Sequence, residues 1–283
     1  MSKTIRAGVM GWPIAHSRSP ALHGHWLRRH DIDGSYIALP VRPEDLPAAL
    51  RALPKQGFAG VNLTVPHKQL ALDIVDRVDP VAARIGAVNT VIVAADGTLD
   101  GTNTDAYGFI ANLRQGAGDA LARYLAGPAA ILGAGGAARA VVVALCDAGV
   151  REIRLVNRTR ANAEPLAELA RQSGADVVLI AWDVRADALA GAGMLVNTTT
   201  LGMQGAPPLD LALDALPGAA LVHDIVYAPL ITPLLAAAQA RGNPIVDGLG
   251  MLLFQAQPAF EAWFGIRPSV DADLRAAVLA ARV

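Results

Sequence analysis

A glycine-rich turn lies between a predicted strand and a predicted helix in the second half of this chain. The apolar run 129–132 leads directly into Gly133-Ala134-Gly135-Gly136-Ala137-Ala138, and an apolar helical pattern continues to Leu145. A G-x-G-x-x-A run between strand and helix is typical of a dinucleotide-binding βαβ unit. The glycines let the backbone approach a pyrophosphate, which lies at the helix N-terminus. The sequence therefore predicts a Rossmann-type sheet here.

The end of the next predicted strand, residues 153–156, indicates which dinucleotide would bind. An NAD site usually has an acidic residue about 20 residues after the glycines, where it binds the ribose hydroxyls. This chain instead has Asn157-Arg158-Thr159-Arg160. Because arginine can pair with a 2′-phosphate, the sequence favours NADP. The alternative is that both arginines are ordinary surface residues on a loop.

A second informative stretch is Asn62-Leu63-Thr64-Val65-Pro66-His67-Lys68. It joins an apolar strand pattern to a helical pattern that runs to Val78, with Pro66 expected at the first helical position and Thr64 as its cap. Lys68 would then lie in a first turn, where the positive end of the helix disfavours its charged form. Such a lysine can act as a general acid or base. Alternatively, its stem lies along apolar surface and its amine reaches water.

Two serines follow the first predicted strand, residues 5–10. Ser19, next to Pro20, is predicted to be the N-cap of a helix. Ser17 is not needed for that cap, so the pair could bind a hydroxylated or anionic ligand.

Two further polar residues stand out. Asn89 interrupts the apolar run 85–93, which is predicted as a strand, so its amide must find partners. Asp105 begins another predicted helix, where the helix dipole favours an acid whether or not it has a functional role.

Composition excludes several classes of protein. A net charge of −1 over 283 residues gives no electrostatic case for binding nucleic acid or an anionic membrane. The most apolar region, 218–240, is interrupted by charged residues and prolines, and no signal-peptide pattern is found at the N-terminus. Cys146 is the only cysteine, so intrachain disulfides and cysteine-based metal sites are excluded. The histidines near the N-terminus lack metal-ligand spacing. We expect a cytoplasmic protein without a metal.

Several motifs occur in order along nearly the whole chain. They are His16-Ser17-Arg18-Ser19-Pro20, Asn62 to Lys68, Ile85-Gly86-Ala87-Val88-Asn89-Thr90, Gly101-Thr102-Asn103-Thr104-Asp105, Gly133 to Arg139, Asn157-Arg158-Thr159, Asp224-Ile225-Val226-Tyr227 and Asp247-Gly248-Leu249-Gly250-Met251. Together they resemble the shikimate dehydrogenase family.

The resemblance implies a two-domain α/β fold. An N-terminal α/β substrate-binding domain, residues 1–106 together with 249–283, would face a Rossmann-type NADP-binding domain, residues 107–248, across a cleft. It also implies the reversible reduction of 3-dehydroshikimate to shikimate by NADPH.

The resemblance further implies roles for individual residues. Lys68 and Asp105 would be the catalytic pair. The residues expected to hold the substrate are Ser17, Ser19, Asn62, Thr64, Asn89, Tyr227 and Gln255. Those expected to bind the cofactor are Gly133, Ala134, Gly135, Gly136, Ala137, Asn157, Arg158, Thr159 and Gly248.

The chain departs from the family at Asn162, where relatives often have a basic residue, so the strength of its NADP preference stays open. One alternative function is a quinate/shikimate dehydrogenase with relaxed NAD use. Another is a dinucleotide-binding regulator without turnover, although the presence of both Lys68 and Asp105 argues against it. We expect a monomer or homodimer whose only partners are small molecules, with neither nucleic acid nor membrane.

Overall fold

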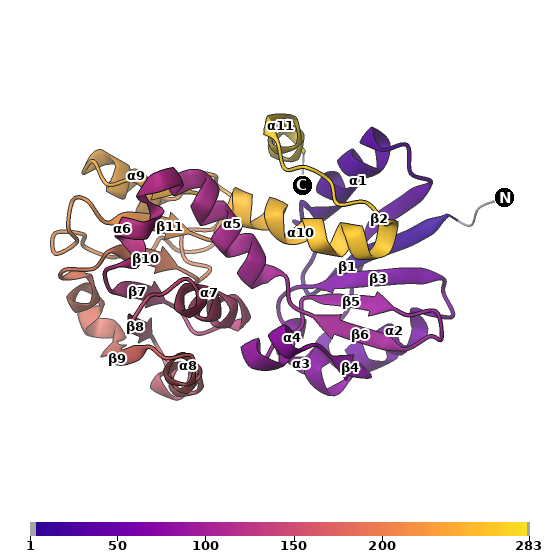
Figure 1. Cartoon of the computed structure of the whole chain (residues 1–283), viewed down its shortest axis with the longest axis horizontal. Helices are drawn as coiled ribbons and strands as arrows, with labels where there is room; N and C mark the ends of the chain where they lie inside the picture. Colours follow the sequence, from indigo (N-terminus) through magenta and orange to yellow (C-terminus); the bar gives the residue numbers. More distant parts are fainter. Residues whose placement is uncertain (1–3, 282–283) are drawn as a thin grey trace. The chain divides into compact units, whose positions relative to one another are not determined.

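The computed structural model describes residues 4–281, which divide into two compact units (Figure 1). The first unit contains the chain up to Asp105 and again from Leu252, and the second is Ala106–Met251. The chain therefore leaves and re-enters the first unit. The assignment of a substrate role to residues 1–106 with 249–283, and of a cofactor role to residues 107–248, stays a prediction.

The first unit is built on a mixed six-stranded sheet of order β2-β1-β3-β5-β6-β4. Its strands are β1 (Ile5–Gly11), β2 (Gly34–Pro40), β3 (Phe58–Leu63), β4 (Arg77–Val78), β5 (Thr90–Val93) and β6 (Leu99–Thr102). β5 is antiparallel to both β3 and β6, whereas β1 is parallel to β3. The carboxyl ends of β1, β3 and β6 and the amino end of β5 therefore meet at one edge of the sheet.

Helices cover this sheet and enclose an apolar core. They are α1 (Ser19–Arg29), α2 (Leu46–Ala52), α3 (His67–Leu70), α4 (Pro80–Ile85) and α11 (Ala272–Ala280), with most of α10 (Leu249–Phe264). α1 packs on β2 and α11. Leu46, Leu50 and Val61 lie in a cluster of fully buried side chains between α2 and the sheet.

The second unit has a parallel six-stranded sheet of order β12-β11-β10-β7-β8-β9. Its strands are β7 (Ala129–Leu132), β8 (Glu152–Asn157), β9 (Asp176–Ala181), β10 (Met194–Asn197), β11 (Leu221–Asp224) and β12 (Ile245–Val246). The strand order reverses between β7 and β10, which is the Rossmann arrangement. In such a sheet, ligands bind beyond the carboxyl ends of the strands at this reversal.

The helices of the second unit either precede its first strand, as α5 and α6 do, or follow one of its strands. They are α5 (Asp105–Ala117), α6 (Leu121–Leu125), α7 (Gly136–Asp147), α8 (Arg160–Gln172) and α9 (Pro233–Ala240). α8 packs on β8 and β9, and α9 packs on β11 and β12. The strands β7 and β10 are completely buried, as expected for central strands covered on both faces.

Three local expectations from the sequence are wrong. The helix predicted to reach Val78 ends at Leu70; a 3₁₀ turn (Ala71–Asp73) follows, and Val78 pairs with β6. The strand predicted over residues 85–93 begins only at Thr90, because Ile85 is the last residue of α4, which Asp79 caps and Gly86 ends in the left-handed conformation.

The third difference concerns helix caps. α1 begins at Ser19 itself, and no side chain caps it; α3 likewise has no side-chain cap, so Thr64 does not serve as one. The Ser19 hydroxyl is consequently not used by the helix.

No helix within residues 4–281 combines the length and apolar character needed to cross a bilayer.

Candidate functional site

Lys68 and Asp105 form a nearly buried ion pair in the first unit. Lys68 lies in α3, just after β3, and Asp105 is the first residue of α5, just after β6. Their strands end at the same edge of the sheet, which brings Lys68 Nζ within 2.5 Å of Asp105 Oδ2. The side chains are 16% and 5% exposed, respectively. The pair is therefore shielded from bulk water.

The Asp105 carboxylate is held on two sides. Asn89 Nδ2 donates to Asp105 Oδ1 at 2.8 Å, so each carboxylate oxygen has its own donor. The Asp105 backbone N–H donates to Asn103 Oδ1 at 2.9 Å, which fixes the start of α5. Asp105 is thus a rigid acceptor for the Lys68 amine.

Asn89 connects the pair to other predicted substrate residues. Its amide oxygen accepts from the Thr104 backbone N–H at 2.8 Å, and its Nδ2 lies 3.4 Å from Gln255 Oε1. Asn62, at the end of β3, donates from Nδ2 to Thr90 Oγ1 at 3.0 Å and to the Asn89 carbonyl at 3.3 Å. Asn62, Asn89 and Gln255 therefore belong to one buried polar network with Lys68 and Asp105.

The remaining predicted substrate residues are placed differently. Ser17 Oγ accepts from the Ser19 backbone N–H at 3.3 Å, so the two serines lie together after β1. Thr64 follows β3 at the same edge, but its hydroxyl makes no hydrogen bond to the network within residues 4–281. Tyr227 belongs to the second unit.

Sequence reasoning missed several members of the network: Thr90, Asn103, Thr104 and Tyr36. All four are buried and polar. Thr90, Asn103 and Thr104 stand next to Asn89 or Asp105 in the chain, so a search for polar residues flanking the predicted ones would have found them. Tyr36 lies in β2 and had no such signal.

The second unit presents features that fit a dinucleotide. Gly135 precedes α7, and no side chain caps that helix, so its first backbone N–H groups are available to an anion. A Cβ at Gly135 would meet no heavy atom within 4 Å, whereas Gly133 has φ +103° and a Cβ there would meet Thr198 Oγ1 at 2.7 Å. Gly133 makes the turn and Gly135 keeps open the space above the helix.

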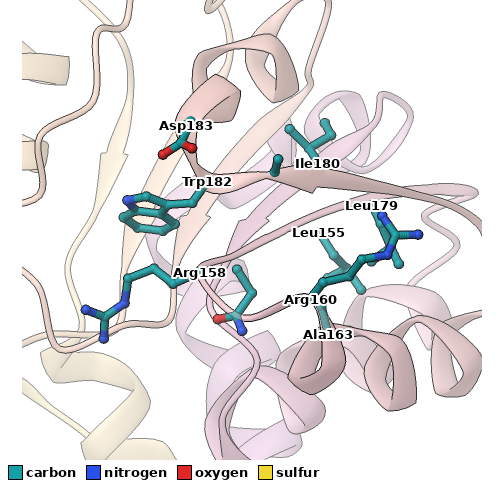
Figure 2. A pocket seen from close by; sticks show the side chains of 10 residues that line it. Leu155, Arg158, Arg160, Ala163, Leu179, Ile180, Trp182 and Asp183 are labelled. Atoms are coloured by element: carbon teal, nitrogen blue, oxygen red, sulfur yellow. The ribbon is translucent and has the colours of Figure 1, made fainter.

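A pocket of about 340 Å³ lies beyond the carboxyl ends of β8 and β9 (Figure 2). Asn157 and Arg158 line it from β8, and Trp182 and Asp183 line it from the end of β9. In Figure 2, Trp182 lies between Arg158 and Asp183, while Arg160 points away from Arg158. Arg160 Nε instead binds Glu164 Oε1 at 3.2 Å. Both arginines line the pocket, and Arg160 is the one that is engaged by an acid of its own helix.

Trp182 and Asp183 were not predicted. The parallel pairing of Asn157 with Ala181 places the ends of β8 and β9 side by side. Parallel pairing of these two predicted strands would therefore have placed Trp182 in the expected adenosine pocket.

The buried Asp224 carboxylate forms hydrogen bonds that link the carboxyl end of β10 to the loop that follows β11. Asp224 accepts from Asn197 Nδ2 at 3.0 Å, from the Val226 backbone N–H at 3.0 Å and from Thr232 Oγ1 at 2.7 Å. Burial raises the pKa of Asp224, although these hydrogen bonds oppose the shift. Tyr227 follows directly in this loop. At Gly248, a Cβ would lie 2.3 Å from the Ile225 carbonyl oxygen, so only glycine fits beside the loop.

The described residues therefore offer an acid/base pair with a polar network and, separately, a dinucleotide cradle. No group of three or more His, Cys, Asp or Glu side chains within residues 4–281 is arranged to hold a metal ion. A lysine with an aspartate partner can supply a proton to an oxygen that gains electrons in a carbonyl reduction.

Comparison with known proteins agrees with this arrangement. Three family descriptions match in succession: the shikimate dehydrogenase substrate binding domain over residues 9–91, shikimate / quinate 5-dehydrogenase over residues 119–199, and the shikimate 5′-dehydrogenase C-terminal domain over residues 248–278. The chain is 61% identical to the shikimate dehydrogenase (NADP(+)) of Paramagnetospirillum magneticum, over 98% of this chain and 99% of that protein.

Solved structures give the same result. Shikimate 5-dehydrogenase from Thermus thermophilus, in complex with NADP(H) and shikimate, superposes with a TM-score of 0.85 at 40% identity, covering 98% of this chain and 99% of that one. Quinate dehydrogenase from Corynebacterium glutamicum, in complex with NAD, superposes with a TM-score of 0.89 at 32% identity, covering 98% and 99%. The predicted family resemblance and the two-domain α/β fold class are confirmed.

Proposed function

The chain belongs to the shikimate dehydrogenase (NADP(+)) family, and from this premise we propose that Lys68 and Asp105 carry out the proton step of its reaction. The reaction is the reversible reduction of 3-dehydroshikimate to shikimate with NADPH. The observation that carries the proposal is the shielded Lys68–Asp105 ion pair, with Nζ and Oδ2 separated by 2.5 Å.

NADPH supplies the hydride that reaches the ketone carbon. The oxygen of that ketone then becomes an alkoxide, which needs a proton. The Lys68 ammonium donates it, and Asp105 holds Lys68 in the orientation required. Because both Asp105 oxygens already have donors in Asn89 and Lys68, the carboxylate stays in place while the proton moves. In the oxidation direction, neutral Lys68 accepts the proton from the substrate hydroxyl.

Substrate binding is assigned to the polar residues at the edge of the first sheet. Their amides and hydroxyls present both donors and acceptors, as a carboxylated triol requires. The set comprises Ser17, Ser19, Asn62, Thr64, Asn89 and Gln255, with Tyr227 contributed by the second unit.

Cofactor binding is assigned to the second unit. The turn Gly133 to Ala137 would hold the pyrophosphate at the start of α7, and Asn157, Arg158 and Thr159 would surround the adenosine ribose. The pocket beyond β8 supports this assignment, because Asn157 and Arg158 line it; Arg160 also lines it but is bound to Glu164. We add Trp182 to the set, since its indole offers a flat surface for the adenine ring. Gly248 would lie near the nicotinamide.

The test measures formation of the reduced cofactor by the purified full chain with four combinations of substrate and cofactor: shikimate or quinate, each with NADP or NAD. We expect shikimate with NADP to give the highest kcat/KM and quinate to be a much poorer substrate. Equal or better turnover of quinate would instead assign the chain to quinate oxidation. Binding of NADP without turnover of either acid would indicate a regulator.

The proposal also includes a cytoplasmic location and a monomeric or homodimeric state. Sedimentation of the purified chain at several concentrations tests the latter.

A further inference from the structure

Tyr36 in β2 has a buried hydroxyl that hydrogen-bonds to one of the proposed substrate-binding side chains. Its phenol donates to Asn62 Oδ1 at 2.6 Å. This bond connects β2 with the end of β3.

The ring of Tyr36 is fixed by an aromatic stack. His23 of α1 lies parallel to it, with ring centroids 3.8 Å apart and planes inclined by 3°. Both His23 nitrogens lack a hydrogen-bond partner within residues 4–281, and burial lowers the pKa of His23 to about 3. A neutral imidazole therefore supports the phenol by stacking. Trp263 of α10 contacts the same ring, with centroids 6.1 Å apart.

The bond to Tyr36 is one of three that hold the Asn62 amide in its orientation. Asn62 Nδ2 donates to Thr90 Oγ1 and to the Asn89 carbonyl, and its Oδ1 accepts from Tyr36. Without the phenol, Oδ1 would have no donor in this buried position, and the amide could turn over to find one. The oxygen side of the Asn62 amide is therefore held by a residue that the sequence does not place beside it.

We propose that Tyr36 is a positioning residue for the substrate: its buried hydroxyl holds the Asn62 amide in the orientation that shikimate requires. The inference rests on the proposed function, because it assumes that Asn62 binds substrate. It adds a residue of β2 that does not itself contact the reacting atoms.

The test compares the full-length wild type with Tyr36→Phe, which keeps the ring and its stack and removes only the oxygen. Losing one positioning hydrogen bond should raise the KM for shikimate by about tenfold or more, with a smaller fall in kcat. The KM for NADP should stay within about twofold, because Tyr36 belongs to the first unit and the proposed cofactor cradle to the second.

Tyr124→Phe is the matched control. Tyr124 is also a buried tyrosine with a bonded hydroxyl, which accepts from Arg123 at 3.0 Å, but it lies in the second unit. This variant should leave the KM for shikimate unchanged. A double-mutant cycle with Asn62→Ala provides a second measurement. If Tyr36 acts partly through Asn62, the effect of Tyr36→Phe on KM should be clearly smaller in the Asn62→Ala background.

An unchanged KM for shikimate in Tyr36→Phe, or full additivity in the cycle, would overturn the inference. Failure of Tyr36→Phe to fold would also overturn it, because the hydroxyl would then be needed by the fold rather than by the substrate. Absence of shikimate turnover in the wild type would contradict the proposed function itself, so the two failures can be told apart.

Discussion

Arg160 Nε donates a hydrogen bond of 3.2 Å to Glu164 Oε1, one turn further along α8. Arg158 and Arg160 both line the pocket at the end of β8 (Figure 2), and this bond engages Arg160 with an acid of its own helix. Asn162 adds no positive charge. We therefore expect the recognition of a 2′-phosphate to depend mainly on Arg158.

Arg158→Ala should weaken NADP binding by about 10- to 100-fold, because charge-assisted hydrogen bonds to the phosphate are lost. NAD has no such phosphate and should lose little. The measurement is kcat/KM for both cofactors, with Arg160→Ala as the control that should leave the NADP/NAD ratio unchanged. If Arg160→Ala changed the ratio and Arg158→Ala did not, the phosphate site would have to be reassigned.

Gly135→Ala should weaken NADP binding without destabilising the protein. A methyl group at this position meets no protein atom within 4 Å, so the fold can accept it. It would, however, occupy the space through which the pyrophosphate approaches the backbone. We expect the KM for NADP to rise by about tenfold or more, with Tm nearly unchanged.

Gly218→Ala is the control, since a methyl group there is equally unobstructed but the residue lies before β11, at the other end of the sheet. It should change neither quantity. A Gly135→Ala variant with normal KM would place the pyrophosphate elsewhere.

His23 should make the protein sensitive to acid. Its pKa is about 3 in the folded state, compared with 6.5 for the free side chain, because burial disfavours the charged ring. The unfolded chain therefore binds a proton that the folded chain does not, and stability is lost as the pH falls from 6.5 toward 3. Between pH 6.5 and pH 4, this linkage amounts to about 3 kcal/mol.

His23→Phe keeps a stacked ring and removes the titration. Urea unfolding at several pH values should show a smaller loss of stability in acid for His23→Phe than for wild type. His30→Phe, at the end of the same helix, serves as the control. Equal acid sensitivity in wild type and His23→Phe would contradict the burial of a neutral His23.

Much of the fold could be predicted because the local signals agreed with it. The glycine turn after Leu132 and the alternation of strands and helices that follows occur as expected. The length of the helix that contains Lys68 was overestimated. Its apolar spacing continues past Leu70, but a 3₁₀ turn buries Ala71 equally well and lets the chain enter β4. Periodicity alone does not distinguish these two ways of burying the same side chains.

The candidate site could be predicted only in part, for a related reason. Asn89 and Asp105 were identified because they are polar residues in conspicuous local positions. The contact between Tyr36 and Asn62 joins residues 26 positions apart in the chain, and it depends on how β2, β1 and β3 pair. Arg160 is a different case, since an acid four residues later was visible in the sequence and predicts an ion pair on the helix surface.

The central claim concerns Lys68, and the most direct measurement is steady-state oxidation of shikimate with NADP by wild type, Lys68→Ala and Lys55→Ala. Lys55 is an exposed lysine of the same unit and is the matched control. Lys68→Ala should lower kcat by at least about 100-fold, the lower range for a positioned acid/base group, and should change the KM for shikimate much less. Lys55→Ala should behave as wild type. A near-normal kcat with a raised KM in Lys68→Ala would contradict the account, because Lys68 would then bind the substrate without transferring its proton.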